Sequence, residues 1–558
     1  MPRKFKGKQI FMEALMAEGV EYIFGNPGTT EMPIMESLTD YPKLKYILTL
    51  HESIAVGAAH YYAQATGKIG VVNVHVGPGL GNSLGMLYNA YEAHTPLVLT
   101  AGQQDTRMRL REPLLGHDLV AMAAPLVKWS VQAEHVDELP HILHQAFKVA
   151  QDAPSGPVFL SLPINVMEEE TEQGPFPPTR IFPRTLPDPE GVRSAAELLT
   201  HARRPAIICG DGVAFAKAQG DLVALAELIG APVWHESLHH QINFPTSHPN
   251  AREGLRSDHA GVRQALGDTD TVLLVGGSFF EEVWHTGENP FPDGAALIQI
   301  ESSPAKLSRN FSLNVGLLAD PKQGLAALRE AVAGMAGKEF AESARQRNDA
   351  MKETKAAERS TQEERAKRLW DSTPIAPSRL MAELKAAMPR DAVIVNESIT
   401  AHADLKRTIP FEQGGDYYGT RGGGIGQGLP GAIGVKLASP ERPVICLSGD
   451  GSAMYSIQAL WTCAHHDIPV VFIILHNRTY RILKINMDIY RQRFGLPGER
   501  PYPHMDLTDP DLWFVEIAGG FGVEGEQVTE PDKLAPALKK AFASGKPYLL
   551  DVVLDGKV

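Results

Sequence analysis

The sequence predicts an α/β protein with three doubly wound domains, each built on a mostly parallel sheet. Its 558 residues are enough for three or four domains of about 150 residues each. Short apolar segments, typical of buried parallel strands, alternate along the chain with longer amphipathic segments that suit crossover helices. Two stretches that are rich in proline or in charge interrupt this alternation, and they divide the chain into three units.

The first domain is expected at residues 1–167, followed by a linker at residues 168–191. The linker is acidic and rich in proline, which indicates a segment that runs over the surface. The strands expected in this domain are residues 22–24, 46–50, 71–76, 97–100 and 158–162. Because helical segments separate these strands, the sheet is expected to be mostly parallel.

The second domain is expected at residues 192–335 and the third at residues 374–558. Between them, residues 336–373 are almost wholly charged or polar and are expected to form a helical or extended connector. The strands expected in these two domains are residues 206–209, 271–275, 296–300, 444–447, 470–475 and 548–553. A glycine-rich loop follows a strand in both the first and the third domain, at residues 77–85 and 422–428, so these domains are expected to share a plan.

The composition disfavours several classes of function. The chain has 53 basic and 66 acidic residues, and the net charge of −13 gives no support for a nucleic-acid surface. No apolar run approaches the roughly 20 residues that cross a membrane, and the amino terminus lacks the apolar core of a signal peptide. The three cysteines have no paired spacing, which fits buried thiols in a reducing compartment. We therefore expect a cytoplasmic protein.

A metal and diphosphate site is predicted in the third domain. Gly449-Asp450-Gly451 follows an apolar strand and precedes a crossover helix expected at residues 453–466, and Asn477 follows the next strand. Asp450 and Asn477 are therefore expected at the carboxyl ends of two neighbouring parallel strands, the edge at which α/β sheets bind ligands. A carboxylate and an amide oxygen suit Mg²⁺, which takes its other ligands from phosphate and water.

The chain contains a control for this pattern. Gly210-Asp211-Gly212 also follows an apolar strand, but the same interval counted from Asp211 leads to Leu238, which cannot bind a metal. Only the copy in the third domain is complete. The alternative, a strand-ending turn that binds no ligand, explains neither the spacing nor the flanking elements.

Several segments resemble the thiamine-diphosphate-dependent enzymes of the 2-oxo acid decarboxylase and acetolactate synthase group, and within it the benzoylformate decarboxylases above all. They lie at residues 24–31, 100–104, 126–130, 396–398 and 449–462. The resemblance implies a first domain that binds the pyrimidine ring of the cofactor and a third domain that binds its diphosphate with Mg²⁺ or Ca²⁺. It also implies an active site shared between subunits, and hence a homodimer at minimum, with a homotetramer favoured.

The resemblance assigns three catalytic residues. Glu52 corresponds to a glutamate that activates the cofactor through a pyrimidine nitrogen, whereas without the resemblance it would more simply be a solvated charge. His75, at the end of a predicted strand, corresponds to a histidine that transfers protons, a task suited to imidazole near neutral pH. Thr29 stands where the benzoylformate decarboxylases have a serine that contacts the substrate carboxylate.

The resemblance further implies a set of cofactor-binding residues. Ile425 corresponds to the aliphatic residue that supports the bent cofactor, and the carbonyl group of Gly423 to the acceptor for the pyrimidine amino group. Asp450, Asn477 and the backbone carbonyl group of Thr479 correspond to the metal ligands. The full set is Asn26, Pro27, Gly28, Glu52, Thr400, Gly423, Ile425, Gly449, Asp450, Gly451, Ser452, Asn477, Thr479 and Tyr480.

Some positions depart from the benzoylformate decarboxylase pattern, and they concern the substrate. Val283 stands at the second catalytic histidine, and His285 would share its face if the segment is extended. Asn486 replaces an aromatic residue of the pocket, and Arg421 replaces an alanine in the cofactor loop. We therefore expect a more polar pocket in which Arg421 offers a cation to an anionic substrate.

These features predict the thiamine-diphosphate-dependent, non-oxidative decarboxylation of a 2-oxo acid, with joining of the decarboxylated intermediate to an aldehyde as a further activity. An acetolactate-synthase-like carboligase or another thiamine-dependent lyase is the alternative, and FAD in the middle domain would accompany it, although no flavin signature supports this. A nicotinamide dehydrogenase is disfavoured because neither glycine-rich loop has a complete dinucleotide fingerprint. A catalytically silent scaffold is the alternative without activity.

Overall fold

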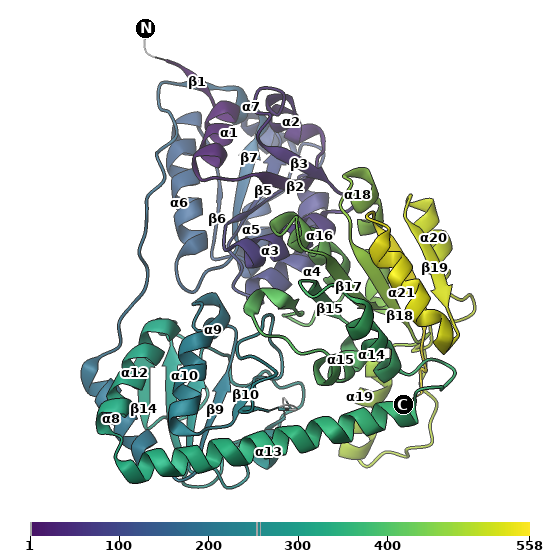
Figure 1. Ribbon diagram of the computed structural model, residues 1–558. Helices are drawn as coiled ribbons and strands as arrows, with labels where there is room; N and C mark the ends of the chain where they lie inside the picture. Colours follow the sequence, from purple (N-terminus) through teal and green to yellow (C-terminus); the bar gives the residue numbers. More distant parts are fainter. Residues whose placement is uncertain (1–2, 253–254, 257, 558) are drawn as a thin grey trace.

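The computed structural model describes residues 3–252, 255–256 and 258–557 of the chain. Within them lie three six-stranded sheets, and the strand pairs of these sheets are all parallel. Figure 1 shows the first domain above the second, with the third beside both. The predicted fold class, three α/β domains with mostly parallel sheets, is confirmed.

The first domain contains a sheet of order β3-β2-β4-β5-β7-β6. The strands are β2 (Tyr22–Asn26), β3 (Lys45–Leu48), β4 (Gly70–Val74), β5 (Leu97–Gln103), β6 (Trp129–Gln132) and β7 (Val158–Pro163). The helices are α1 (Gly7–Ala17), α2 (Met32–Ser37), α3 (Glu52–Thr66), α4 (Gly77–Glu92), α5 (Leu119–Ala123), α6 (Leu139–Gln151) and α7 (Ile164–Glu168). The sequence did not reveal β6, a short edge strand with every side chain half-buried. Because β4 ends at Val74, His75 lies in the loop after the strand and not within it.

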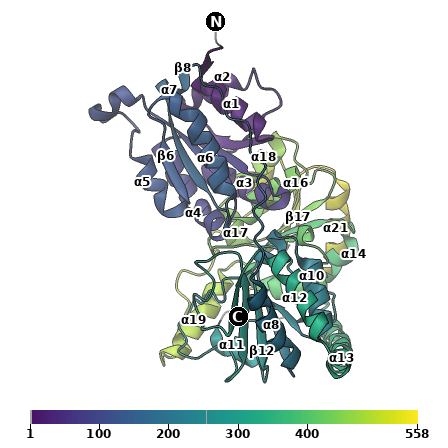
Figure 2. The ribbon, with the colours of Figure 1, turned by 90° about the vertical axis from the view of Figure 1, so that its left-hand side faces the viewer.

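The second domain contains a sheet of order β11-β10-β9-β12-β13-β14. The strands are β9 (Pro205–Cys209), β10 (Val233–His235), β11 (Ala251–Arg252), β12 (Thr271–Val275), β13 (Ala296–Glu301) and β14 (Val315–Leu318). The helices are α8 (Pro189–His201), α9 (Gly212–Phe215), α10 (Gln219–Ile229), α11 (His259–Leu266) and α12 (Pro321–Met335). Helices α8, α10 and α12 pack on one face of the sheet and α11 on the other, as Figure 2 also shows. The inner strands β9, β12 and β13 are therefore buried on both faces, which explains their largely apolar sequences, whereas the edge strand β14 is partly exposed.

The third domain contains a sheet of order β16-β15-β17-β18-β20-β19. The strands are β15 (Val393–Glu397), β16 (Tyr417–Tyr418), β17 (Val444–Gly449), β18 (Val471–His476), β19 (Glu524–Val528) and β20 (Tyr548–Val553). The helices are α14 (Pro377–Ala387), α15 (His402–Thr408), α16 (Gly428–Ala438), α17 (Asp450–Met454), α18 (Ala459–His465), α19 (Arg481–Arg493), α20 (Phe514–Gly520) and α21 (Leu534–Ala543).

The crossover helix expected at residues 453–466 is wrong as a single element. It is divided into α17 and α18, because the backbone N–H groups of Tyr455 and Ser456 donate to carbonyl groups three residues back and not four. The strand before the break and the strand after it are in the expected places.

The first and third domains share one strand order, which is 2-1-3-4-6-5 when each domain's strands are numbered along the chain. They pack through α3 and α16, whose apolar residues belong to one continuous core. Gly434 allows the close approach, since a Cβ atom there would lie 2.1 Å from the carbonyl oxygen of Ala58. The shared strand order confirms the common plan expected of these domains, but residues 77–85, expected as a glycine-rich loop, form the start of α4.

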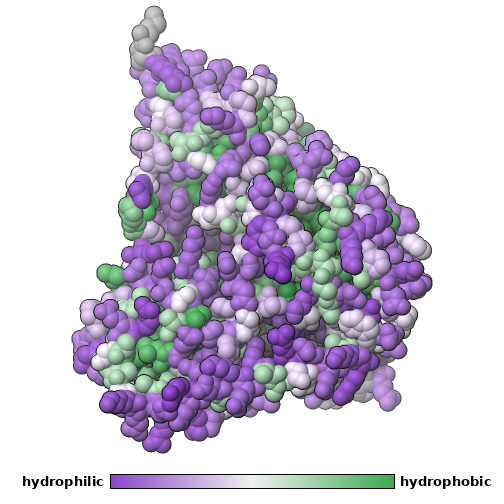
Figure 3. All heavy atoms as spheres, in the orientation of Figure 1, coloured by the Kyte–Doolittle hydropathy of each residue, from purple (hydrophilic) through white to green (hydrophobic). Residues whose placement is uncertain are grey.

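Two segments join the domains. The predicted connector contains α13 (Lys338–Arg368), a helix of 31 residues with only Ala344 and Met351 buried. It runs along the lower edge of the molecule in Figure 1, and this edge is mostly hydrophilic in Figure 3. The segment after β8 (Glu170–Thr171), which pairs with β1 (Phe5–Lys6), has no helix or strand before α8. No helix in the described residues is long and apolar enough to cross a membrane.

Candidate active site

The predicted catalytic glutamate is held at the carboxyl edge of the first sheet. Glu52 is the first residue of α3, and 6% of it is exposed. Its carboxylate accepts hydrogen bonds from the side-chain amides of Asn26, at 3.3 Å, and Asn82, at 3.0 Å. Asn26 ends β2 and Asn82 lies on α4, so three elements fix this carboxylate. Asn82 is a residue that the sequence interpretation missed.

His75 is oriented by a second buried carboxylate. Its Nδ1 atom lies 2.9 Å from Oε2 of Glu31, which is fully buried. Glu31 also accepts from the backbone N–H groups of Gly28 and Gly102, each at 2.7 Å. Because this carboxylate serves as an acceptor, Nδ1 of His75 is the donor, and Nε2 is left to exchange a proton. Glu31 lies within a segment that carries the family resemblance, and this was its only signal in the sequence.

Two glycines allow Glu52 and His75 to lie side by side. A Cβ atom on Gly79 would be 3.0 Å from Oε1 of Glu52 and 3.1 Å from Cβ of His75. A Cβ atom on Gly28 would be 1.9 Å from Nδ1 of His75. The structure thus brings together Asn26, Gly28, Glu52 and His75, with Thr29 exposed at the rim.

We expect Glu31→Gln to lower kcat by about 10-fold or more. A general acid–base group such as His75 contributes roughly 10²–10⁴-fold to the rate, and the variant should lose part of that contribution. The amide keeps the size of the side chain but places an NH₂ group against N–H donors, so the His75 ring loses its fixed orientation. Steady-state turnover measures the effect. Glu36→Gln, on the exposed surface of α2, is the matched control and should leave kcat unchanged. If the two variants have equal kcat values, Glu31 does not orient His75 for catalysis.

The predicted metal edge is formed by the ends of β17 and β18. Asp450 is 3% exposed and follows β17, and its carboxylate accepts from the backbone N–H groups of Gly451, at 2.7 Å, and Arg478, at 2.6 Å. Asn477 follows β18, and its side-chain oxygen accepts from the N–H group of Thr479 at 3.1 Å. The carboxylate of Asp450 thereby links the ends of β17 and β18, which the spacing predicted to be neighbours.

The donor atoms at this edge fit a hard cation. They are a carboxylate, an amide oxygen and a backbone carbonyl group, and burial raises the pKa of Asp450, so a cation there would stabilise its charged form. No group of three His, Cys, Asp or Glu residues within the described ranges could hold a metal. The predicted metal ligands include a single carboxylate, so the site is of the kind in which phosphate and water complete the coordination of the metal.

The glycine-rich loop of the third domain is fixed by a carboxylate at its end. Glu397, the last residue of β15, is buried and accepts from the N–H groups of Gly426, Gln427 and Gly428, at 2.7, 3.1 and 2.7 Å. Burial raises the pKa of Glu397 to about 7. Gly423 lies in the loop before the three residues that Glu397 holds, and it is exposed with φ +84°. Glu397 lies in the segment 396–398 that carries the family resemblance, and its role in holding this loop is visible only in the structure.

The remaining cofactor positions lie around this loop and the metal edge. Ile425 and Thr400 are half-buried, Ser452 is buried, and Tyr480 lies so close to Gly451 that a Cβ atom there would be 2.3 Å from the Tyr480 ring. Pro27 is half-buried between Asn26 and Gly28, and Gly449 ends β17. No hydrogen bond or ion pair among the described residues connects the Glu52 group with the Asp450 group.

The substrate positions expected from the resemblance are spread over other elements. Val283 and His285 are both exposed, in a segment without helix or strand, and Asn486 is half-buried on α19. His285 accepts through its backbone carbonyl group from Arg493 at the end of α19. Arg421, expected to offer a cation to the substrate, instead points into the second domain, where the buried carboxylates of Asp211 and Glu236 and the half-buried carboxylate of Glu281 surround it. No hydrogen bond or ion pair among the described residues joins His285 to His75.

Comparison with known proteins identifies the family. Three models of thiamine pyrophosphate enzymes match the chain: the N-terminal TPP binding domain at residues 5–122, the central domain at residues 192–328 and the C-terminal TPP binding domain at residues 399–552. The benzoylformate decarboxylase of Pseudomonas aeruginosa is 34% identical, covering 97% of each chain. A probable acetolactate synthase large subunit of Methanocaldococcus jannaschii is 30% identical, covering 99% of this chain and 92% of the relative.

A solved structure extends the likeness to three dimensions. The thiamine diphosphate-dependent 4-hydroxybenzoylformate decarboxylase of Rhodococcus jostii RHA1 matches with a TM-score of 0.85 and 30% identity, over 99% of both chains. The matched models cover the whole second sheet and most strands of the other two, with β6, β7 and β15 outside the matched residues. They include Glu52, His75, Asp450 and Asn477. On the strength of this architecture and these matches, the chain belongs to the thiamine pyrophosphate enzyme family.

Proposed function

We propose that this protein is a thiamine-diphosphate-dependent lyase that decarboxylates a 2-oxo acid, in the manner of a benzoylformate decarboxylase. The observation that carries the proposal is that Glu52 and His75 lie together at one edge of the first sheet, each held by hydrogen bonds from its own partners. The likeness to two decarboxylases of aromatic 2-oxo acids supports the reaction class.

The residues of the chain would divide the work as follows. When bound, thiamine diphosphate supplies a carbon nucleophile and an electron sink for decarboxylation. Glu52 would hold the pyrimidine ring and control a proton on its nitrogen. His75, with Nδ1 held by Glu31, would move a proton at Nε2 to or from the reacting substrate. The exposed hydroxyl group of Thr29 would bind the carboxylate of the 2-oxo acid.

The metal edge would hold Mg²⁺, or Ca²⁺ in its place, together with the diphosphate. Asp450, Asn477 and the carbonyl group of Thr479 would be the ligands from the protein, and Ser452 and Tyr480 would contact the diphosphate. The buried carboxylate of Asp450 supports this, since among these ligands it alone carries a charge that a cation would balance.

We also propose that the active site is completed by a second copy of the chain, as a homodimer at minimum and a homotetramer in the complete assembly. Leu50 is 45% exposed and Tyr455 61% exposed beside the two groups of site residues, and Leu110 at 90% and Leu114 at 83% are exposed in the segment after β5. Leu50 comes shortly before Glu52, and Tyr455 shortly after Ser452. Exposed apolar surface of this kind favours association.

The reaction class is tested with a panel of 2-oxo acids that includes benzoylformate, pyruvate and a small polar oxo acid. We expect carbon dioxide release from at least one of them without any acceptor, and a ligation product only when an aldehyde is added. The likeness to an acetolactate synthase supports a second candidate, a carboligase. Carbon dioxide release that requires a second carbonyl compound would favour that candidate over the decarboxylase.

A further inference from the structure

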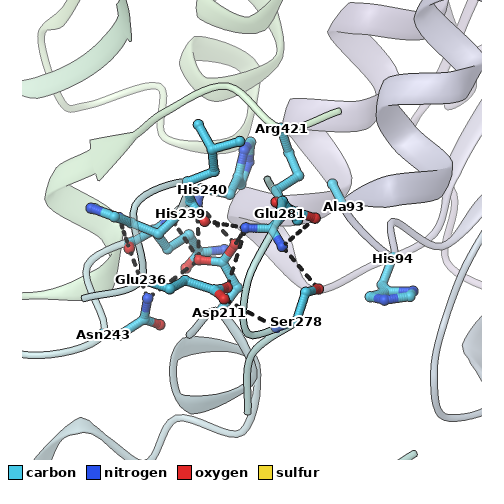
Figure 4. A network of polar contacts seen from close by, with 12 residues as sticks. Ala93, His94, Asp211, Glu236, His239, His240, Asn243, Ser278, Glu281 and Arg421 are labelled. Atoms are coloured by element: carbon cyan, nitrogen blue, oxygen red, sulfur yellow. Dashed lines mark hydrogen bonds and ion pairs between the residues drawn. The ribbon is translucent and has the colours of Figure 1, made fainter. Parts of the chain in front are cut away.

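Arg421 of the third domain is a buried cation whose partners belong to the second domain. Only 4% of the residue is exposed. Its Nη1 atom lies 3.3 Å from Oε1 of Glu236 and 3.7 Å from Oδ2 of Asp211, and its Nη2 atom lies 3.0 Å from Oε1 of Glu281 and 3.2 Å from Oγ of Ser278. Figure 4 shows the guanidinium group pointing from the third-domain loop into this set of side chains. We call Asp211, Glu236 and Glu281 the carboxylate cage.

The cage lies where an α/β sheet of this order binds a ligand. With its strands numbered along the chain, the second sheet has the order 3-2-1-4-5-6, and the order reverses between β9 and β12. Asp211 follows β9, Glu236 follows β10, and Glu281 follows β12. Ligands of such sheets bind in the crevice outside the strand ends at the point of reversal. In this protein the guanidinium group of the chain itself occupies that position.

The cage is built to hold a cation. Asp211 accepts from the N–H groups of His240, at 2.9 Å, and Gln241, at 3.1 Å, and Glu236 accepts from the N–H group of Ser278 at 3.0 Å. These bonds fix Asp211 and Glu236 in place around Arg421, whose planar fork can pair with several carboxylates. Burial raises the pKa of Glu236 to about 7.

The backbone of Arg421 begins the glycine-rich loop of the cofactor site. Gln427 donates through Nε2 to the carbonyl groups of Arg421, at 2.9 Å, and Gly424, at 2.6 Å. Gly422 and Gly423 have φ values of +79° and +84°, a region that glycine enters without strain. Glycines do not hold a conformation by themselves, so the anchors on either side decide where the carbonyl group of Gly423 points.

We propose that Arg421 is a positioning residue, which seats in the ligand crevice of the second domain and thereby fixes Gly422 and Gly423 for the cofactor. The inference rests on the proposed function for the role of the Gly423 carbonyl group. Arg421 touches neither substrate nor cofactor in this account. The second domain thus contributes to the cofactor site by binding the side chain of Arg421.

The test compares Arg421→Met and Arg421→Lys with the wild-type protein. We expect Arg421→Met to raise the Kd of thiamine diphosphate, measured by calorimetry with Mg²⁺, by about 10- to 100-fold. At saturating cofactor, the KM for the 2-oxo acid should stay within about threefold, since no substrate contact is lost. Lysine should restore part of the affinity, because its ammonium group balances the charge but lacks the fork. An unchanged Kd with a raised KM would overturn the proposal and make Arg421 a substrate contact.

A second readout does not depend on bound cofactor. Hydrogen exchange of the backbone amides of residues 422–428 should be faster in Arg421→Met than in the wild-type apoprotein, because one anchor of the loop is gone. The double variant Arg421→Met, Glu236→Gln removes one uncompensated carboxylate and should fold even if the single variant does not. It should keep the fast exchange and the weak cofactor binding. Exchange and Kd equal to those of the wild type would contradict the proposal.

Arg442→Met is the matched control. Arg442 is half-buried, pairs with Asp416 at 2.8 Å and donates to the carbonyl groups of Asp391 and Gly415, all within the third domain. Its loss should leave the Kd of thiamine diphosphate and the exchange of residues 422–428 unaltered. If the wild-type protein itself binds no thiamine diphosphate, the proposed function fails. If the wild type binds and Arg421→Met binds equally well, only the positioning role fails.

Discussion

Glu52→Gln is expected to lower kcat by about 10²–10⁴-fold while the affinity for thiamine diphosphate stays within a few-fold of the wild type. The substitution keeps the shape of the side chain at the start of α3. It replaces a carboxylate, which can hold or move a proton, with an amide that does neither. Asn26 and Asn82 donate to different oxygens of the carboxylate. Glutamine has a single side-chain oxygen, so it can keep the hydrogen bond from only one of these two residues.

The two quantities should be measured on one preparation, turnover by carbon dioxide release and affinity by calorimetry. Glu21→Gln is a suitable control, because Glu21 is exposed and forms a surface ion pair with Lys68. It should leave both quantities unchanged. If Glu52→Gln turns over a good substrate at the wild-type rate, Glu52 does not activate the cofactor.

Asp450→Asn is expected to weaken cofactor binding by about 100-fold or more, equivalent to about 2.7 kcal/mol. The carboxylate accepts one N–H group on each oxygen, from Gly451 and Arg478. Asparagine has one acceptor oxygen, so its NH₂ group would face an N–H donor, and the charge that attracts Mg²⁺ is lost. The unfavourable N–H contact and the lost charge both weaken the binding of Mg²⁺ and thiamine diphosphate.

Thermal unfolding provides the measurement for this variant. A ligand at 100 times its Kd stabilises the folded state by about 2.7 kcal/mol. The wild-type protein should therefore unfold at a higher temperature when thiamine diphosphate and Mg²⁺ are present, and Asp450→Asn should lose most of the shift. A chelator should abolish the wild-type shift. Asp467→Asn, on an exposed loop, is the control. A full shift in Asp450→Asn would contradict the assigned metal edge.

The sequence predicted the metal edge because its parts are set by local rules. Parallel strands end at one edge, so Asp450 after β17 and Asn477 after β18 had to be neighbours once the strands were recognised. The break between α17 and α18 was not predictable in the same way, because the apolar residues continue through it and only the backbone bonds of Tyr455 and Ser456 change.

The residues that hold the site in place were missed for a different reason. Glu31 binds the N–H group of Gly102 and Glu397 that of Gly428, far along the chain in each case. The side chain of Arg421 crosses between domains to reach Glu236. Such contacts depend on how the sheets and domains pack, and neither periodicity nor spacing records that packing. The sequence therefore indicated Arg421 as unusual but directed it toward the substrate.

The most direct test of the account is calorimetric titration of the apoprotein with thiamine diphosphate in the presence of Mg²⁺. We expect saturable binding with one cofactor for each chain, and loss of that binding when Mg²⁺ is removed by a chelator. Absence of binding with Mg²⁺ present, in a protein whose unfolding transition shows that it is folded, would show that the protein is not a thiamine-diphosphate-dependent enzyme.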